Sequence, residues 1–184
     1  MSGRVAIQGA AVAGLVLMML TTPTAGQQSE LVPFEIQDQF DRVHRHTDYE
    51  GRLVIMIGSD REGSEFHDDW ESAIRDSLQA EEWKPEEAAF VSVADVRGVP
   101  FFLKGNVKGK FSRDEAEWVL LDWEGHLSKT YGLKPNATNI LVFASDGALV
   151  VHVHGRELDP KVLSVILTAV RRLRSSASSS RACC

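Results

Sequence analysis

A run of five apolar residues, 53–57, is followed by a polar loop and then by an amphipathic segment. The apolar run and the amphipathic segment together constrain the fold more than any other feature of the sequence. An unbroken and mostly branched apolar run of this length is typical of a strand that is buried on both faces. The segment 64–82 then places its apolar residues at helical spacing, and Ser64 can cap its first turn. A buried strand that is followed by a helix and another strand predicts a parallel crossover within a helix-covered sheet.

The apolar patterns elsewhere predict an α/β domain over residues 31–174. The other predicted elements are, in chain order, a hairpin of 34–36 with 43–46, a strand at 90–96, a short strand at 118–122, helical turns at 126–132, a hairpin of 140–143 with 149–154, and a helix that begins at Asp159 and Pro160. The last hairpin is antiparallel, so the sheet is mixed. Residues 98–113 fit no single pattern, and we expect Phe101, Phe102 and Leu103 to be buried there.

The N-terminal residues have the composition of a targeting segment. Arg4 precedes the apolar run 9–20, and small residues follow it up to Gly26, which is the order of a secretory signal peptide. We therefore expect residues 1–26 to be a signal peptide and the domain to be secreted or periplasmic, without a stable membrane span after cleavage. An uncleaved anchor is the alternative, although the apolar run is short for a span of about 20 residues.

The C-terminal segment and the overall charge exclude several classes of protein. Residues 175–184 are rich in serine and predict a disordered tail. This tail holds the only two cysteines, Cys183 and Cys184, so a disulfide-stapled core and a cysteine metal site within the domain are excluded. The chain has 20 Lys and Arg against 26 Asp and Glu, a net charge of −6, which disfavours nucleic-acid binding. We expect no cofactor.

The order of elements and several short strings resemble the redoxin branch of the thioredoxin fold. Residues 49–52, before the buried run, resemble the Y-x-G-K turn that precedes the central strand in peroxiredoxin-like and cytochrome-maturation thioredoxins. Strings that resemble the second half of the family are Tyr131-Gly132-Leu133, residues 140–143, Asp146-Gly147 and Gly155. Strings similar to the YtfJ-type family of secreted bacterial proteins are residues 98–102, 120–125 and 133–135. The resemblance implies a thioredoxin-like three-layer α/β/α sandwich with a mixed central sheet and an N-terminal β-hairpin.

The chain departs from this family at the place where the chemistry of the redox-active members lies. Those members carry Cys-x-x-Cys at the start of the helix after the central strand, where the helix dipole stabilises a thiolate. Residues 61–64 of this chain are Arg-Glu-Gly-Ser. The family's cis-proline falls near Ala137, and we expect a trans peptide before Thr138 because a cis bond before a non-proline residue costs about 3 kcal/mol. Without sulfur, thiol–disulfide exchange has no nucleophile.

The resemblance therefore predicts a binding or accessory module that has no catalytic residues and uses the surface of the former active site. We call this surface the rim; its residues are Ser59, Asp60, Arg61, Glu62, Gly63, Ser64, Pro135, Asn136, Ala137 and Thr138. Its partner is an unidentified protein or small molecule. The alternative is a redoxin-like oxidoreductase that acts on peroxide or disulfides through Cys183 and Cys184 or through an atypical site, for which Ser64 and His67 are a candidate nucleophile and base.

Two histidine pairs allow a different hypothesis. The pairs are His44 with His46 and His152 with His154, and alternation places each pair on one face of a predicted strand. If the two hairpins met, the four imidazoles could bind zinc or copper. The simpler interpretation is surface or half-buried histidines on strands.

One glycine-containing segment gathers four cations, which are Lys104, Lys108, Lys110 and Arg113. It is either a loop that docks an anion or a partner, or a solvated loop on an acidic protein.

Overall fold

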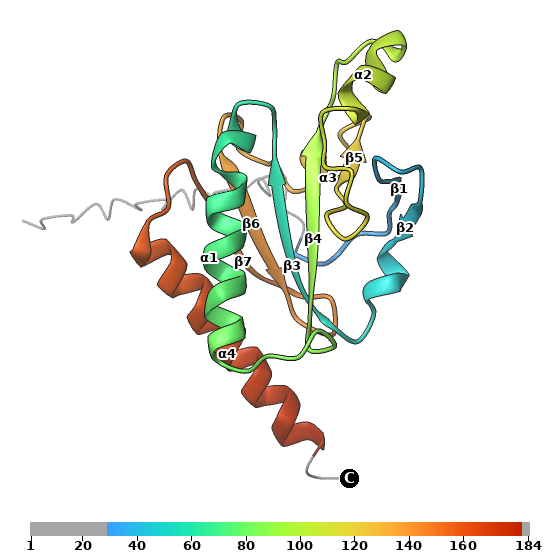
Figure 1. The fold of residues 1–184 in the computed structure, drawn as a ribbon. Helices are drawn as coiled ribbons and strands as arrows, with labels where there is room; N and C mark the ends of the chain where they lie inside the picture. Colours follow the sequence, from blue (N-terminus) through green and yellow to red (C-terminus); the bar gives the residue numbers. More distant parts are fainter. Residues whose placement is uncertain (1–28, 182–184) are drawn as a thin grey trace, which may run out of the picture.

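The computed structural model describes residues 29–181, and a five-stranded sheet forms its centre (Figure 1). The strands are, in chain order, β3 (Leu53–Ser59), β4 (Ala88–Asp95), β5 (Leu120–Asp122), β6 (Thr138–Phe143) and β7 (Leu149–Gly155). Their order across the sheet is β5-β4-β3-β6-β7, with β4 parallel to β3 and β5, and with β6 antiparallel to β3 and β7. The predicted mixed sheet, parallel crossover and late antiparallel hairpin are confirmed.

The two long helices, α1 (His67–Ala80) and α4 (Pro160–Arg181), cover one face of the sheet (Figure 1). Alternate residues of β3 point toward them, so Ile55 and Trp70 are fully buried between sheet and helix. Trp70 also donates its indole N–H to the carbonyl of Arg156 at 3.1 Å. Apolar side chains therefore fill this layer, and the one polar atom of Trp70 has a partner.

The other face is covered by shorter elements, which are the hairpin of β1 (Glu35–Gln37) and β2 (Val43–Arg45), the 3₁₀ turn η1 (His46–Tyr49) and α3 (His126–Thr130). Val54 and Met56, the remaining alternate residues of β3, pack on this side, which is why β3 has no polar face. The Tyr131 hydroxyl accepts the Val32 N–H at 2.8 Å and donates to the Glu30 carbonyl at 3.0 Å. The expected three-layer sandwich with an N-terminal hairpin is thus present.

Helix α4 continues further than the sequence indicates. It runs to Arg181, which corrects the prediction of a disordered tail for residues 175–181. Ser175 and Ser176 each donate to the carbonyl four residues earlier at 3.0 Å, so these hydroxyls are satisfied within the helix. Among residues 29–181 no helix has the length and hydropathy needed to cross a bilayer. The terminal cysteine pair and the predicted signal peptide lie outside the described residues.

After β4 the chain passes beyond the end of the sheet and forms the 3₁₀ turn η3 (Phe101–Leu103) and the short helix α2 (Lys104–Lys108) (Figure 1). We call residues 101–110 the tip. The expected burial of its apolar residues is wrong, because Phe101 is 84%, Phe102 70% and Leu103 38% exposed. The tip extends past the layer that the helices cover, so the two phenylalanine rings keep most of their surface in solvent.

Candidate functional site

The two halves of the rim lie against each other at the end of β3. Ser59, the last residue of β3, pairs with Thr138, the first residue of β6. Thr138 Oγ1 donates to the carbonyl of Gly63 at 3.0 Å. A Cβ atom on Gly63 would lie 2.3 Å from the carbonyl oxygen of Ala137, so the two backbones approach as closely as only glycine permits. The segments 59–64 and 135–138 therefore lie side by side in the folded chain.

Asp60 joins the same two segments through its carboxylate. Its Oδ1 accepts the N–H of Gly63 and its Oδ2 accepts the N–H of Asn136, both at 2.8 Å. Asn136 has a φ of 57°, a left-handed conformation that asparagine tolerates better than most residues. The buried Asn139 amide donates to the carbonyls of Lys134 at 3.0 Å and Ala137 at 3.1 Å. Hydrogen bonds within the chain thus fix the shape of the rim.

The ten predicted rim residues fall into two groups. Four are buried and shape the backbone, namely Ser59, Gly63, Ala137 and Thr138. The six that reach the surface are Asp60, Arg61, Glu62, Ser64, Pro135 and Asn136. Only the second group can touch a ligand, because the first has almost no accessible area. The peptide before Thr138 is trans, as predicted, since the described residues contain no cis peptide bond.

Ser64 is neither the helix cap nor the nucleophile that its position in the sequence suggests. The segment Gly63–Phe66 forms the 3₁₀ turn η2, and α1 begins only at His67. Ser64 therefore does not cap α1. Its hydroxyl donates to the Arg61 carbonyl at 2.7 Å, so Ser64 and His67 do not form the nucleophile–base pair that we considered.

His67 instead belongs to a polar cluster that the sequence interpretation missed. Its Nδ1 lies 3.2 Å from Ser59 Oγ, and its Nε2 lies 3.1 Å from Glu71 Oε2. Ser92 Oγ donates to the same Glu71 oxygen at 2.8 Å. A carboxylate can only accept, so in the neutral imidazole Nε2 donates to Glu71 and Nδ1 accepts the Ser59 hydroxyl. The cluster connects α1 to β3 and β4, and the four-residue spacing of His67 and Glu71 is its only signal in the sequence.

The environment of Glu71 keeps its carboxylate ionised. Burial opposes ionisation, but the hydrogen bonds from His67 and Ser92 and the positive charge of Arg75 outweigh it and lower the pKa of Glu71 to about 2. The Ser59–His67–Glu71 connectivity is that of a nucleophile, a base and an orienting acid. Ser59, however, is only 5% exposed and lies within β3, so a substrate has no access to its oxygen. The arrangement stabilises the junction between β3 and α1.

The four histidines of the metal hypothesis do not come together. The β1–β2 hairpin lies beside β5, one edge of the sheet, whereas His152 and His154 lie on β7, the opposite edge. His46 belongs to η1 rather than to a strand, and His44 lies 3.0 Å from Asp38 and stacks on Trp118. Within residues 29–181 no group of three or more potential ligands is placed to hold a metal ion.

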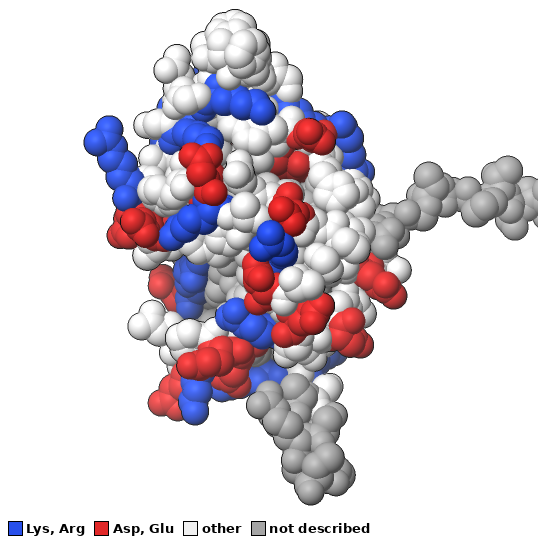
Figure 2. All heavy atoms as spheres, turned by 90° about the vertical axis from the view of Figure 1, so that its right-hand side faces the viewer, with Lys and Arg blue, Asp and Glu red and all other residues white. Residues whose placement is uncertain are grey.

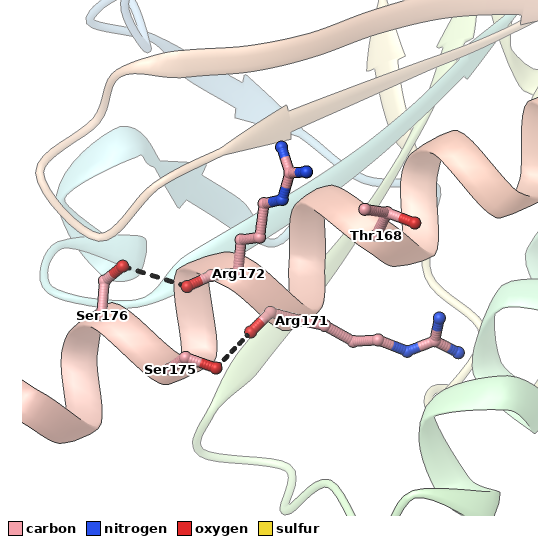
Figure 3. A pocket seen from close by; sticks show the side chains of 5 residues that line it. All are labelled: Thr168, Arg171, Arg172, Ser175 and Ser176. Atoms are coloured by element: carbon pink, nitrogen blue, oxygen red, sulfur yellow. Dashed lines mark hydrogen bonds between the residues drawn. The ribbon is translucent and has the colours of Figure 1, made fainter.

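A shallow hollow on α4 is lined by Thr168, Arg171, Arg172, Ser175 and Ser176 (Figure 3). The two guanidinium groups point in different directions, and that of Arg171 pairs with Glu81 at 2.5 Å. Because the two guanidinium groups do not point toward a common position, the hollow offers no arrangement that would bind an anion. The rim remains the best candidate for function.

Comparison with known proteins identifies the fold. No family model matches the chain, and no curated protein matches it. The exposed lipoprotein thioredoxin Etrx1 from Streptococcus pneumoniae superposes with a TM-score of 0.53 and 20% identity, covering 77% of this chain and 99% of its own. The thioredoxin domain of a thiol-disulfide oxidoreductase from Bacteroides vulgatus gives 0.53 and 13% identity, covering 79% and 97%. BsSco, of the Sco family of cytochrome c oxidase assembly proteins, gives 0.55 and 12% identity, covering 82% and 96%.

These structures share the architecture of the chain over nearly their whole length. The chain therefore has a thioredoxin-like fold of the kind found in redoxins, as the resemblance in its sequence implies. At such low identity the likeness concerns the fold and carries no activity with it.

Proposed function

We propose that this protein is a thioredoxin-fold binding module without thiol catalysis, and that its rim binds a protein or small-molecule ligand. One observation carries the proposal: the two loops of the rim are held together by internal hydrogen bonds and present polar side chains, and neither loop contains a cysteine. A surface that is already ordered costs little conformational entropy on binding.

The exposed side chains of the rim indicate the chemistry of the ligand. Arg61 and Glu62 are both exposed, and neither makes an ion pair with another residue in the range 29–181. Two opposite charges that are free of internal partners favour a polar ligand with groups of both signs, such as a peptide segment. We place this activity outside the cytoplasm as part of the proposal, since a signal peptide is expected at residues 1–26 and a neighbour is named as an exposed lipoprotein.

A quantitative pull-down from cell-envelope extract tests the proposal. The full chain is compared with the variant Arg61→Ala/Glu62→Ala, which changes only exposed rim side chains. The matched control is Glu50→Ala/Arg172→Ala, which removes one exposed acid and one exposed base outside the rim. We expect the rim variant to lose proteins or small molecules that the wild type and the control both retain. Identical recovery by all three chains would refute a binding role for the rim.

A thiol–disulfide oxidoreductase or peroxide-reducing enzyme is the second candidate, favoured by the neighbour that is named a thiol-disulfide oxidoreductase. Insulin reduction by the full chain distinguishes the two proposals. Absence of turnover supports the binding module. Turnover that disappears in Cys183→Ser/Cys184→Ser supports an enzyme that uses the terminal thiols. Turnover that survives this substitution contradicts the binding module and points to an atypical site.

A further inference from the structure

The tip presents two aromatic rings to solvent at the end of the molecule where β4 finishes. Phe101 and Phe102 are 84% and 70% exposed, and their rings meet edge to face at 5.9 Å. Leu103 adds a third, partly exposed apolar side chain. These two phenylalanines are the most exposed large apolar residues of the described chain, and exposed apolar groups that cluster in this way mark interaction sites.

Positive charge accompanies the exposed rings. Residues 96–113 hold five Lys and Arg and no Asp or Glu, although the chain as a whole has an excess of acids. Figure 2 shows uncoloured atoms at the top of the molecule, with Lys and Arg side chains directly below them. Lys108 pairs with Asp41, and Lys104 lies 4.7 Å above the ring of Trp123. Lys110 and Arg113 are exposed and make no ion pair with any residue in the range 29–181.

The shape of the tip favours a lipid surface over a protein. A specific protein interface buries roughly 1,200–2,000 Å² in total, whereas two phenylalanines contribute about 150–250 Å² each. A second copy of the chain that contacts the tip alone would therefore gain too little area for a stable dimer. A bilayer needs no complementary shape, because it accepts aromatic rings at the boundary of headgroups and acyl chains. Anionic headgroups add attraction for each nearby Lys or Arg.

We propose that the tip, together with the residues that follow it up to Arg113, docks the domain onto an anionic phospholipid surface, with Phe101 and Phe102 inserted at the headgroup boundary and with Lys110 and Arg113 facing lipid phosphates. The tip follows β4 and the rim follows β3, and these strands are parallel, so both features lie at the same end of the sheet (Figure 1). Docking therefore turns the rim toward the membrane surface. This inference stands independently of what the rim binds.

Hydrogen–deuterium exchange of the full chain, resolved by peptide, tests the proposal at the tip itself. The local readout matters because the apolar run 9–20 can contact lipid without the tip. We expect phosphatidylcholine vesicles that contain phosphatidylglycerol to slow exchange over residues 98–113 by about tenfold or more. Vesicles of phosphatidylcholine alone should slow exchange much less. Both Phe101→Ser/Phe102→Ser and Lys110→Glu/Arg113→Glu should lose most of this protection.

The control variant is Val150→Ser/Val165→Ser, since these side chains are 48% and 54% exposed and lie on β7 and α4. It should keep full protection of the tip, as should Arg61→Ala/Glu62→Ala, so a failed rim proposal leaves this result unchanged. Three outcomes overturn lipid docking: no protection on any vesicle, equal protection on both compositions, or protection that rises with protein concentration without lipid. The last outcome would indicate a second copy of the chain on the tip.

Discussion

Replacing Gly63 with alanine is a direct test of the contact that closes the rim. The added Cβ would lie 2.3 Å from the Ala137 carbonyl oxygen and 2.6 Å from its carbon, and both are backbone atoms that no rotamer change can move. The two segments must separate, which strains the 3.0 Å bond from Thr138 to Gly63 and the 2.8 Å bond from Gly63 to Asp60. Overpacking costs about 1–3 kcal/mol, and each weakened hydrogen bond adds about 1 kcal/mol.

We therefore expect Gly63→Ala to lower the free energy of unfolding by about 3–5 kcal/mol, and Tm by about 6–20 °C for a chain of this size. Urea unfolding followed by circular dichroism measures the change in midpoint. Gly105→Ala is the matched control, because a Cβ there meets nothing within 4 Å and alanine favours the helix α2. A Gly63→Ala protein as stable as the control would refute the close backbone contact.

Three further substitutions probe other parts of the structure. Glu71→Gln should lower the free energy of unfolding by up to about 3 kcal/mol at neutral pH, because the ionised carboxylate stabilises the fold above pH 4.5 and this stabilisation is lost toward pH 2. Urea unfolding from neutral pH down to pH 2 should show the difference between wild type and variant disappear. Asn139→Ala should lower the free energy of unfolding by about 2–4 kcal/mol in thermal unfolding, because it leaves the carbonyls of Lys134 and Ala137 without their side-chain donor, and the second of these lies in a buried residue. Phe101→Ser/Phe102→Ser should change the free energy of unfolding by less than about 0.5 kcal/mol in the same assay, because both rings are exposed.

The arrangement of the sheet could be predicted because the responsible signals are local. The apolar run 53–57 requires cover on both faces, and the structure supplies α1 and α4 on one side and α3 with the hairpin on the other. Asp146 and Gly147 indicate the turn between β6 and β7, where Gly147 has a φ of 88°. The grouping of residues 61–64 and 135–138 into one surface rests on the family resemblance. A resemblance to a known fold indicates which distant segments are neighbours, and local patterns do not.

The remaining features depend on contacts that spacing does not reveal. Phe101 and Phe102 are residue types typical of a core, yet their segment extends beyond the sheet, where both rings stay largely exposed. Ser64 stands before an amphipathic run, but a 3₁₀ turn delays the helix to His67. The bond between His67 and Ser59 joins a helix to a strand, so only the folded chain brings these atoms together. Polar clusters of this kind need coordinates, because each member taken alone looks like a surface residue or a cap.

The buried Asn139 amide has a consequence for the ligand binding proposed at the rim. Since its donors are already satisfied by Lys134 and Ala137, the surface is assembled in advance, and the proposed binding at the rim should be of the lock-and-key kind. Stopped-flow association should then follow a single exponential with no conformational step. Ionic strength should slow it to the extent that Arg61 and Glu62 steer the approach.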